Sequence, residues 1–408
     1  MIHRFIHSLL RRRHFWRYAT FDEVAELYAS RLLRIFAVHM VSLFIVVYLY
    51  NQGYSLVFIS LYLAAYFLAK VPLAFVAAAL TGWFGPKRMI LLANLLYIPA
   101  MILFTQVPEA GAPHALMMIA LFGTFQSLGA TIYDYAYMVN FSKVKHADHA
   151  GKELGYMHII EKIASIISPI IGGLLATLFD PVVVMIVAAC LFASSALPLL
   201  RTAEPIKTRQ RIKWVGFPWR TTWRSTIAQT GVGFDVVTTG SMWSLFLLTV
   251  VFVAQQDGIY AIIGILTAVG MAVAFISAFV FGKLIDRREG GILLKYGVIA
   301  KSLGHIMRPL TGNMLGAVAI NAGSEVATTG YSMAFTRGMF DVADYSGFRL
   351  TYLLCIEIAV NIGASLAAAT AALVFYLTEP HYAFMLFFVA AAGYILIVAT
   401  PQFSLYKR

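Results

Sequence analysis

The sequence predicts an all-α integral membrane protein whose twelve transmembrane helices form two six-helix, pseudo-symmetric bundles. Three observations predict this fold. Of the 408 residues, 60% are hydrophobic and only 12% are charged, whereas about 25% of the residues in soluble domains are charged. Apolar stretches of roughly 20 residues, the length that crosses a bilayer, recur along the chain. The Lys and Arg residues gather in alternate loops between these stretches, which is how membrane proteins fix their orientation.

The apolar stretches divide into six before and six after a polar segment near the middle. The first six expected spans are 30–51, 56–83, 89–108, 114–140, 154–178 and 181–200. The second six are 226–252, 258–284, 291–311, 314–337, 348–377 and 381–402. Each is long enough to cross the membrane as a helix.

These spans predict five parts of the chain. Residues 1–21 form a basic segment with apolar residues at helical spacing, which is typical of a helix lying on the cytoplasmic membrane surface. The expected parts are then the N-terminal bundle 22–200, the basic cytoplasmic linker 201–225, the C-terminal bundle 226–402 and the cytoplasmic tail 403–408. The segments 1–21 and 201–225 are expected to anchor the chain to the membrane rather than to carry chemistry.

The loop charges predict the orientation. Basic residues occur in the N-terminal segment, in the central linker and in every second loop, whereas turns such as 51–55 and 105–113 contain neither Lys nor Arg. Because cytoplasmic loops carry the excess of Lys and Arg, both termini are expected to be cytoplasmic. We expect the chain in the cell membrane as a multi-pass protein.

Several chemistries are not indicated. Cys190 and Cys355 both lie in apolar stretches, so no disulfide is expected. The pair Gly282-Lys283 lacks the rest of a phosphate-binding loop, so direct use of ATP is not expected. The group of His146, Asp148 and His149 has no further ligands at metal-site spacing, and a solvated loop is the simpler interpretation. We therefore expect no cofactor, no metal and no enzymatic activity.

The two halves resemble each other in sequence. Met138–Lys143 between spans four and five resembles Met333–Arg337 between spans ten and eleven. Glu161 in the fifth span has a counterpart in Glu357 in the eleventh, at nearly the same offset. Many secondary transporters are built from such repeats and bind their substrate between the halves near the middle of the membrane.

Over residues 22–402 the chain resembles the major facilitator superfamily. That family has two six-helix bundles and a motif between helices two and three of each half: Gly, three residues, Asp, Arg or Lys, one residue, Gly and a basic pair. The segment Gly282-Lys-Leu-Ile-Asp286-Arg287-Arg288 matches the first part of this motif. In the first half the acidic residue is missing, because Gly82 occupies its position. The resemblance implies solute transport, with Gly282, Asp286 and Arg287 in a cytoplasmic latch.

A second pattern resembles helix five of the drug–proton antiporters in this family. Small residues recur at the family spacing, with Ala and Ser in place of two glycines: Gly155, Ala164, Ser168, Pro169, Gly172 and Gly173. Small residues allow membrane helices to approach closely, and proline bends them. The pattern favours the antiporter branch and export. The alternative is a tightly packed helix with no such role.

Charges inside the membrane indicate the site. Each costs about 2.5–3.5 kcal/mol at the bilayer centre and therefore needs a partner or a polar cavity. The resemblance implies that helices one, four, seven and ten line a central cavity. The expected substrate and proton site consists of Glu325, Asp235, Asp134, Asn321, Tyr133, Tyr137, Gln126, His39 and Thr239.

The reasons for these residues differ. Asn321, Glu325, Thr328 and Ser332 follow helical spacing and form one polar stripe in the tenth span. In the fourth span Tyr133 and Tyr137 share a face with Gln126, and they would either stack on a planar or cationic ligand or simply pack.

Two further groups leave alternatives open. Asp235 would serve substrate binding or a gating ion pair, and His39 would carry protons or pack by hydrogen bonding.

Further charged residues are expected to act as gates. Arg31 and Arg34 in the first span would pair with Asp134 or Glu161, or would reach the membrane surface. Glu357 would pair with Arg287 as a latch. Glu161 would find Lys162, Arg31 or Arg34. Lys70 would face the cavity and attract an anion, whereas Lys301 is expected to be structural.

The sequence thus favours a secondary active transporter that moves a small solute by alternating access, coupled to protons, with export favoured slightly over uptake. Its expected partners are the solute, protons and lipid, with no nucleic acid, and a monomer is expected. The alternatives are an uptake symporter for a nutrient or organic anion, and a non-transporting receptor or scaffold on the same fold.

Overall fold

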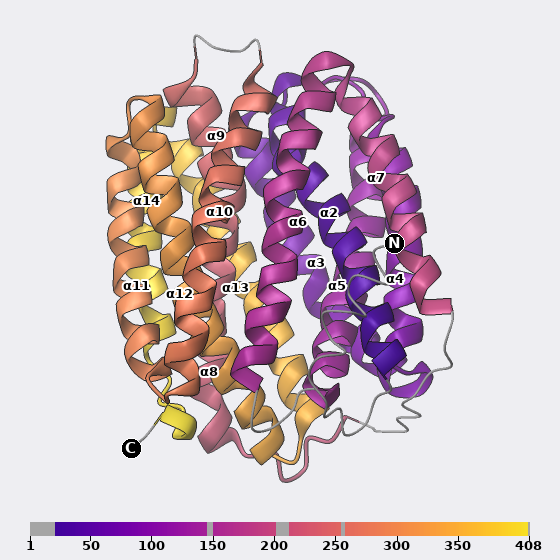
Figure 1. Cartoon of the computed structure of the whole chain (residues 1–408). Coiled ribbons are helices and arrows are strands. Elements are labelled where there is room, and N and C mark those ends of the chain that lie inside the picture. Colours follow the sequence, from indigo (N-terminus) through magenta and orange to yellow (C-terminus); the bar gives the residue numbers. More distant parts are fainter. Residues whose placement is uncertain (1–20, 145–149, 201–211, 254–257, 407–408) are drawn as a thin grey trace.

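The computed structural model describes residues 21–144, 150–200, 212–253 and 258–406, and all of its regular structure is helical. The first half consists of α2 (Phe21–Asn51), α3 (Leu56–Phe84), α4 (Pro86–Phe104), α5 (Ala115–Val144), α6 (Ala150–Leu178) and α7 (Pro181–Ala196). The second half consists of α8 (Trp219–Val237), α9 (Trp243–Phe246), α10 (Ile259–Asp286), α11 (Gly290–Met307), α12 (Met314–Tyr345), α13 (Arg349–Leu377) and α14 (Pro380–Ile395). The two halves stand side by side (Figure 1).

The predicted twelve-helix fold is confirmed in the described part of the chain, because α8 and α9 belong to one helical segment. Two π-helical turns, Thr238–Met242 and Leu247–Val251, continue that segment on either side of α9. Ten helical segments of the described residues are long and apolar enough to cross a membrane. The two others, α11 and α12, have the length, but they carry the polar residues described below.

The helix ends differ from the expected ones where polar residues continue a helix beyond the bilayer. The first helix begins at Phe21 rather than at residue 30, and the tenth ends at Tyr345 rather than at residue 337. Helix α8 begins at Trp219, inside the predicted linker. The predicted surface segment lies outside the described residues except for Phe21, as do linker residues 201–211.

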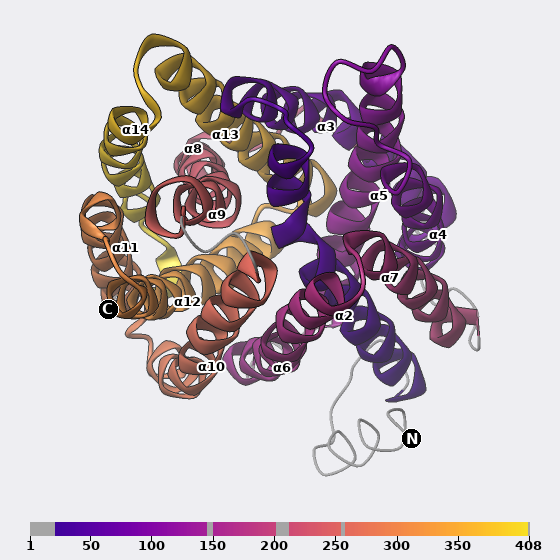
Figure 2. The same cartoon turned by 90° about the horizontal axis from the view of Figure 1, so that it is seen from above.

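Two helix pairs join the halves. Helix α6 packs against α10, and α3 packs against α13, on opposite sides of the molecule (Figure 2). Small residues permit the first contact, because a Cβ atom on Gly173 would lie 2.7 Å from the carbonyl oxygen of Tyr260, and Gly264 faces the carbonyl of Pro169. In the second contact the hydroxyl of Ser365 donates to the carbonyl of Ala64 at 3.0 Å.

The halves also touch at both ends of the bundle. We call the end that carries Lys87 and Arg88, in the first turn of α4, and the connection Arg287–Glu289 the basic end. At this end the hydroxyl of Tyr135 donates to the carbonyl of Leu350 at 2.9 Å. At the far end the side-chain amide of Asn51 donates to the hydroxyl of Tyr260 at 3.1 Å. The space between the halves is thus bridged above and below.

The C-terminal tail folds back onto the basic end of the second half. The hydroxyl of Tyr406 donates to the carbonyl of Ala334 at 2.9 Å, and its ring lies against Gly290. Phe403 is buried against Gly338 and makes an edge contact with Phe335. The tail therefore joins the start of α11 to α12.

Candidate substrate and proton site

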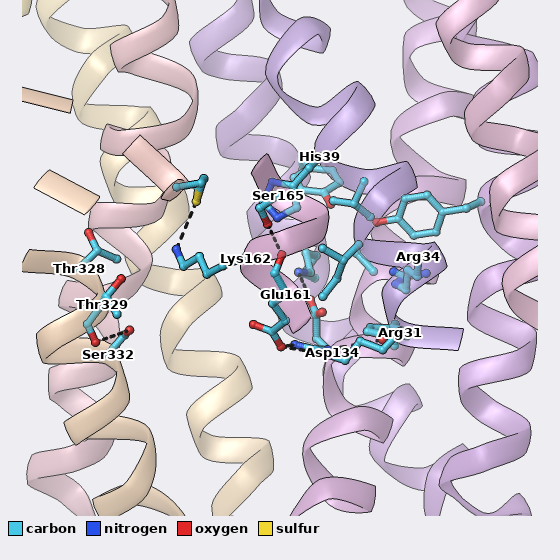
Figure 3. Close-up of a pocket in the computed structure, with 18 residues that line it drawn as sticks. Arg31, Arg34, His39, Asp134, Glu161, Lys162, Ser165, Thr328, Thr329 and Ser332 are labelled. Carbon is cyan, nitrogen blue, oxygen red and sulfur yellow. Dashed lines mark hydrogen bonds and ion pairs between the residues drawn. The ribbon is translucent and has the colours of Figure 1, made fainter. Parts of the chain in front are cut away.

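Two adjoining cavities lie between the halves. The first has a volume of about 410 Å³ and is nearer the basic end, because Arg31 and Arg34, near the start of α2, line it (Figure 3). The second has a volume of about 360 Å³ and is lined mainly by apolar residues. His39, Tyr66 and Met271 line both cavities. A charged chamber thus adjoins an apolar one, with these three residues between them.

Ion pairs lie along the wall of the charged chamber. Arg31 on α2 pairs with Glu161 on α6. The ammonium group of Lys70 on α3 lies 3.2 Å from the carboxylate of Asp134 on α5. Glu357 on α13 lies 3.8 Å from the same ammonium group. Lys70 therefore connects a carboxylate of its own half with one of the other half.

A second ion pair also crosses between the halves. The ammonium group of Lys162 on α6 lies 3.4 Å from the carboxylate of Glu325 on α12, and it donates to the sulfur of Met271 on α10 at 3.2 Å. Glu325 is buried and lines the apolar chamber. Figure 3 shows Lys162 reaching from α6 toward the second half.

Arg34 differs from the other cations of the chamber. Its side chain is 3% exposed and donates to the amide oxygen of Asn94 at 2.9 Å. Its guanidinium carbon lies 3.6 Å from the ring centre of Tyr133 and 4.5 Å from that of Tyr97. Among the described residues, no carboxylate lies within ion-pair distance of it.

The predicted tyrosines of α5 stack on arginines. Tyr133 and Tyr137 lie parallel, with ring centres 5.7 Å apart. Arg34 lies over Tyr133, and Arg31 lies 3.6 Å over Tyr137. Both rings are buried, and only Tyr133 is among the residues that line the charged chamber. The rings thus stack on arginines of the protein itself, and their predicted stacking on a ligand stays a prediction.

The other predicted cavity residues divide between the chambers. Asp134 and His39 line the charged chamber. Asn321 and Gln126 line the apolar one, where the amide of Asn321 donates to the carbonyl of Leu266 at 2.9 Å. The polar stripe of α12 thus runs along both chambers, since Thr328 and Ser332 also line the first.

Asp235 lies elsewhere than expected. It is buried and lines neither chamber, because its side chain points into the second half, where it accepts from the hydroxyl of Tyr331 at 2.6 Å. His305 lies 2.9 Å and Lys301 lies 3.4 Å from its carboxylate. Thr239 does line the apolar chamber and donates to Asp235 at 3.0 Å. Asp235 is therefore separated from the cavity by Thr239.

This buried cluster includes a residue that the sequence reasoning did not assign to a site. Arg308 is fully buried and donates to the hydroxyl of Ser324 at 3.2 Å and to the carbonyl of Thr238 at 3.3 Å. Lys301 is fully buried as well and donates to Ser324 at 2.7 Å. The sequence does contain a pattern that indicates this cluster, because residues 301, 305 and 308 are basic and share one helix face.

The predicted latch does not form between Glu357 and Arg287. Glu357 contacts Lys70 and accepts from the side-chain amide of Asn361 at 2.8 Å. Arg287 and Asp286 are exposed at the end of α10, and Gly282 is buried one turn earlier. Glu357 lies two turns inside α13, so the cavity lysine, rather than the surface arginine, is within its reach.

The small residues of helix five serve helix contacts. A Cβ atom on Gly172 would lie 2.7 Å from the carbonyl oxygen of Met40 on α2, and Gly173 faces α10 as described above. Ser168 is buried, and Pro169 lies within α6. Gly155 belongs to α6, but its surroundings lie outside the described residues. The observed contacts account for small residues at 172 and 173 through packing.

Comparisons with known proteins agree with this fold. The family model described as Major Facilitator Superfamily matches residues 27–352. The crystal structure of the human organic anion transporter MFSD10 (TETRAN) has a TM-score of 0.71 at 10% identity, covering 93% of this chain and 98% of that chain.

Two bacterial structures are similar in the same way. The Escherichia coli fucose:proton symporter FucP has a TM-score of 0.63 at 16% identity, covering 92% of this chain and 97% of that chain. A bacterial homologue of the iron transporter ferroportin has a TM-score of 0.68 at 13% identity, covering 94% and 99%. At these identities the similarity concerns the fold. No curated protein matches the chain in sequence.

Proposed function

We propose, from the premise that this chain belongs to the major facilitator superfamily, that it moves a small solute by alternating access and couples this movement to protons. Family membership makes the chain a multi-pass membrane transporter rather than an enzyme. The coupling to protons is supported by one observation above all. Two carboxylates between the halves, Glu325 at the apolar chamber and Glu357 beside Lys70, each face a lysine of the other half.

The proposed mechanism uses these two ion pairs. In alternating access the two halves rock around a central site, so groups that face each other across the cavity separate as it opens. A proton on Glu325 removes its negative charge and with it the attraction of Lys162. One of the two charged links between the halves is then lost. Protonation of Glu325 thus controls the contact between α6 and α12.

The direction of solute transport is also proposed. Export is proposed first, on the resemblance of helix five to the antiporter pattern. Uptake of an organic anion together with protons is the second candidate, and it is favoured by the four cations that line the charged chamber, Arg31, Arg34, Lys70 and Lys162. The human structure of similar fold is that of an organic anion transporter, which agrees with the second candidate.

We also propose the membrane location, the orientation and the oligomeric state of the protein. The basic residues at the turns of the basic end support a cytoplasmic position for that end and for both termini. We place the chain in the cell membrane as a monomer, with lipid around the helices.

Proton flux into vesicles tests the proposal. The full chain is reconstituted with an entrapped pH-sensitive dye, and organic anions, sugars, amino acids and amphipathic cations are added in turn. Symport acidifies the vesicle interior when solute enters, whereas antiport makes it more alkaline, so the sign of the signal reports the direction. We expect the proton signal to be lost in Glu325→Gln, because the amide cannot carry a proton.

A matched variant controls for the loss of a carboxylate. Glu379→Gln changes an exposed residue that makes no capping hydrogen bond at the start of α14, and it should keep the signal. An undiminished proton signal in Glu325→Gln would show that Glu325 is not the coupling group.

A further inference from the structure

We infer that the solute is an amphipathic organic monoanion whose carboxylate binds Arg34 and whose apolar part occupies the second chamber. This inference deepens the proposed function and rests on it, since it names the substrate class of the same cavity. Arg34 carries a charge that the protein leaves without an opposite charge in the described residues, and the chambers provide space on its cavity side.

The charges around the two chambers and the Asp235 cluster do not balance. Among the described residues, the cations of these groups are Arg31, Arg34, Lys70, Lys162, Lys301 and Arg308, and the carboxylates are Asp134, Glu161, Asp235, Glu325 and Glu357. One positive charge therefore remains when all of them are ionised. At the basic end Lys87 and Glu26 neutralise each other at 2.9 Å. A buried charge without a counterion is costly, so a bound monoanion would stabilise this arrangement.

Arg34 is the group at which this positive charge meets the cavity. Asn94 and the tyrosine rings hold its guanidinium plane but contribute no negative charge. A guanidinium binds a carboxylate with two parallel hydrogen bonds, a geometry that a lysine does not offer. Arg31 lies one turn away and is already paired with Glu161. The anionic group of a solute therefore meets Arg34 as the available partner.

The second buried cluster carries one excess positive charge, which offsets the second carboxylate at Lys70, where Asp134 and Glu357 face one ammonium group. The net positive charge is therefore that of Arg34.

The two basic residues of this cluster, Lys301 and Arg308, interact with one buried carboxylate of the same cluster, Asp235. Lys301 also donates at 2.7 Å to the hydroxyl of Thr328, which lines the charged chamber. The excess charge thus lies directly behind the cavity wall, where the low dielectric weakens its field little.

The pairing of the other cations limits the solute to one negative charge. A second anionic group would have to replace Glu161 at Arg31, Glu325 at Lys162 or the two carboxylates at Lys70. The apolar chamber selects the rest of the molecule. It is lined by large apolar side chains, including Leu63, Phe67, Trp243, Leu247 and Leu266. Such a surface binds hydrocarbon or aromatic groups.

Ligand binding to the purified full chain tests the inference. The probes are phenylbutyrate, octanoate and indoleacetate, each compared with its own neutral amide and with the amine of matching length, and dissociation constants come from thermal shifts. We expect at least one carboxylate to bind about tenfold or more tightly than its amide, because a hydrogen bond to a charged group is worth that much. Phenylsuccinate, with two carboxylates, should bind more weakly than phenylbutyrate.

Variants locate the binding group. Arg34→Gln should weaken the binding of the carboxylate about tenfold and leave that of the amide unchanged. Arg224→Gln, which removes an exposed arginine at the basic end of α8, should change neither. If Arg34→Gln does not fold, the affinities of the unmodified protein for each carboxylate and for its amide still test the inference. If no carboxylate binds more tightly than its amide, or if Arg34→Gln binds it undiminished, the inference is wrong.

The inference and the proposed function can fail separately. A carboxylate that binds through Arg34 but produces no proton signal in vesicles keeps the anion site and overturns proton coupling. A proton signal that only sugars or amines produce keeps the transport mechanism and overturns the anion site.

Discussion

The ammonium group of Lys162 on α6 lies 3.4 Å from the carboxylate of Glu325 on α12, so one ion pair joins the two halves beside the cavity. Lys70 and Glu357 form a second link, at 3.8 Å between α3 and α13. The first pair lies on the side of the molecule where α6 packs against α10, and the second lies where α3 packs against α13 (Figure 2). Each interface between the halves thus has its own buried charge pair.

Removing one partner of the first pair should destabilise the protein. Lys162→Met leaves Glu325 buried without an opposite charge, and breaking a buried pair in this way costs about 3–5 kcal/mol. The double variant with Glu325→Gln should regain most of the loss, since no charge then remains unpaired. Thermal unfolding of both variants in detergent measures the difference. Equal stability of the single and double variants would mean that an unpaired Glu325 carries no cost in the folded protein.

The cluster around Asp235 should matter more for stability than for binding. Asp235→Asn keeps the shape of the side chain but leaves Lys301 without its ion-pair partner and removes the negative charge near the buried Arg308. We expect a loss of about 3 kcal/mol or more in the free energy of unfolding. Because Asp235 lines neither chamber, the affinity for a bound anion should not fall. A variant that keeps its stability but loses binding would place Asp235 in the substrate site instead.

Gly173 should not tolerate even a methyl group. Its Cβ atom would lie 2.7 Å from the carbonyl oxygen of Tyr260, so Gly173→Ala should force α6 and α10 apart and cost about 1–3 kcal/mol. Gly304→Ala on α11 is the matched control, because nothing lies within 4 Å of the added Cβ atom. That change should be neutral or slightly stabilising. Thermal unfolding of both variants compares them directly, and equal behaviour would contradict the close contact.

The docked tail should detach at alkaline pH. Burial raises the pKa of Tyr406 above its ordinary value of about 10. Because the folded state holds the neutral phenol, this contribution is fully present below pH of about 10 and is lost as the pH rises further. The anisotropy of a fluorophore attached after residue 408 should therefore fall above that pH. In Tyr406→Phe the fall should be absent, whereas an unchanged alkaline transition would assign it to another group.

Hydropathy and loop charges were sufficient to predict the twelve helices, because each span must cover its backbone polar groups in lipid by itself. They were not sufficient to predict which way each polar side chain points. Asp235 and Thr239 are one turn apart on the same helix, yet Thr239 lines the cavity and Asp235 does not. The hydrogen-bond and ion-pair partners of Asp235 on α11 and α12 set its orientation. The sequence of its own helix gives no information about these partners.

Partners of charged residues were predicted unevenly for a similar reason. Arg31 pairs with Glu161, which was one of the expected pairs. The family motif predicts Arg287 as the partner of Glu357, but Glu357 contacts Lys70, which lies deeper in the bundle. Arg34 was expected to pair with an acid or to reach the surface, and it contacts Asn94 and aromatic rings instead. A neutral amide partner leaves no charge pattern in a sequence.

The two π-helical turns beside α9 bear on how the helical segment that contains α8 and α9 can change in length. A π-helical turn holds one residue more than the α-helical turn it replaces, and it is equivalent to a single inserted residue. Gly240 lies in the first such turn, Thr238–Met242, and no atom lies within 4 Å of a Cβ atom placed on it. Deleting this residue would convert the turn to regular α-helix and keep the register of Asp235 on one side and Trp243 on the other. The wall of the apolar chamber can therefore lose a residue during evolution without losing the helix that carries it.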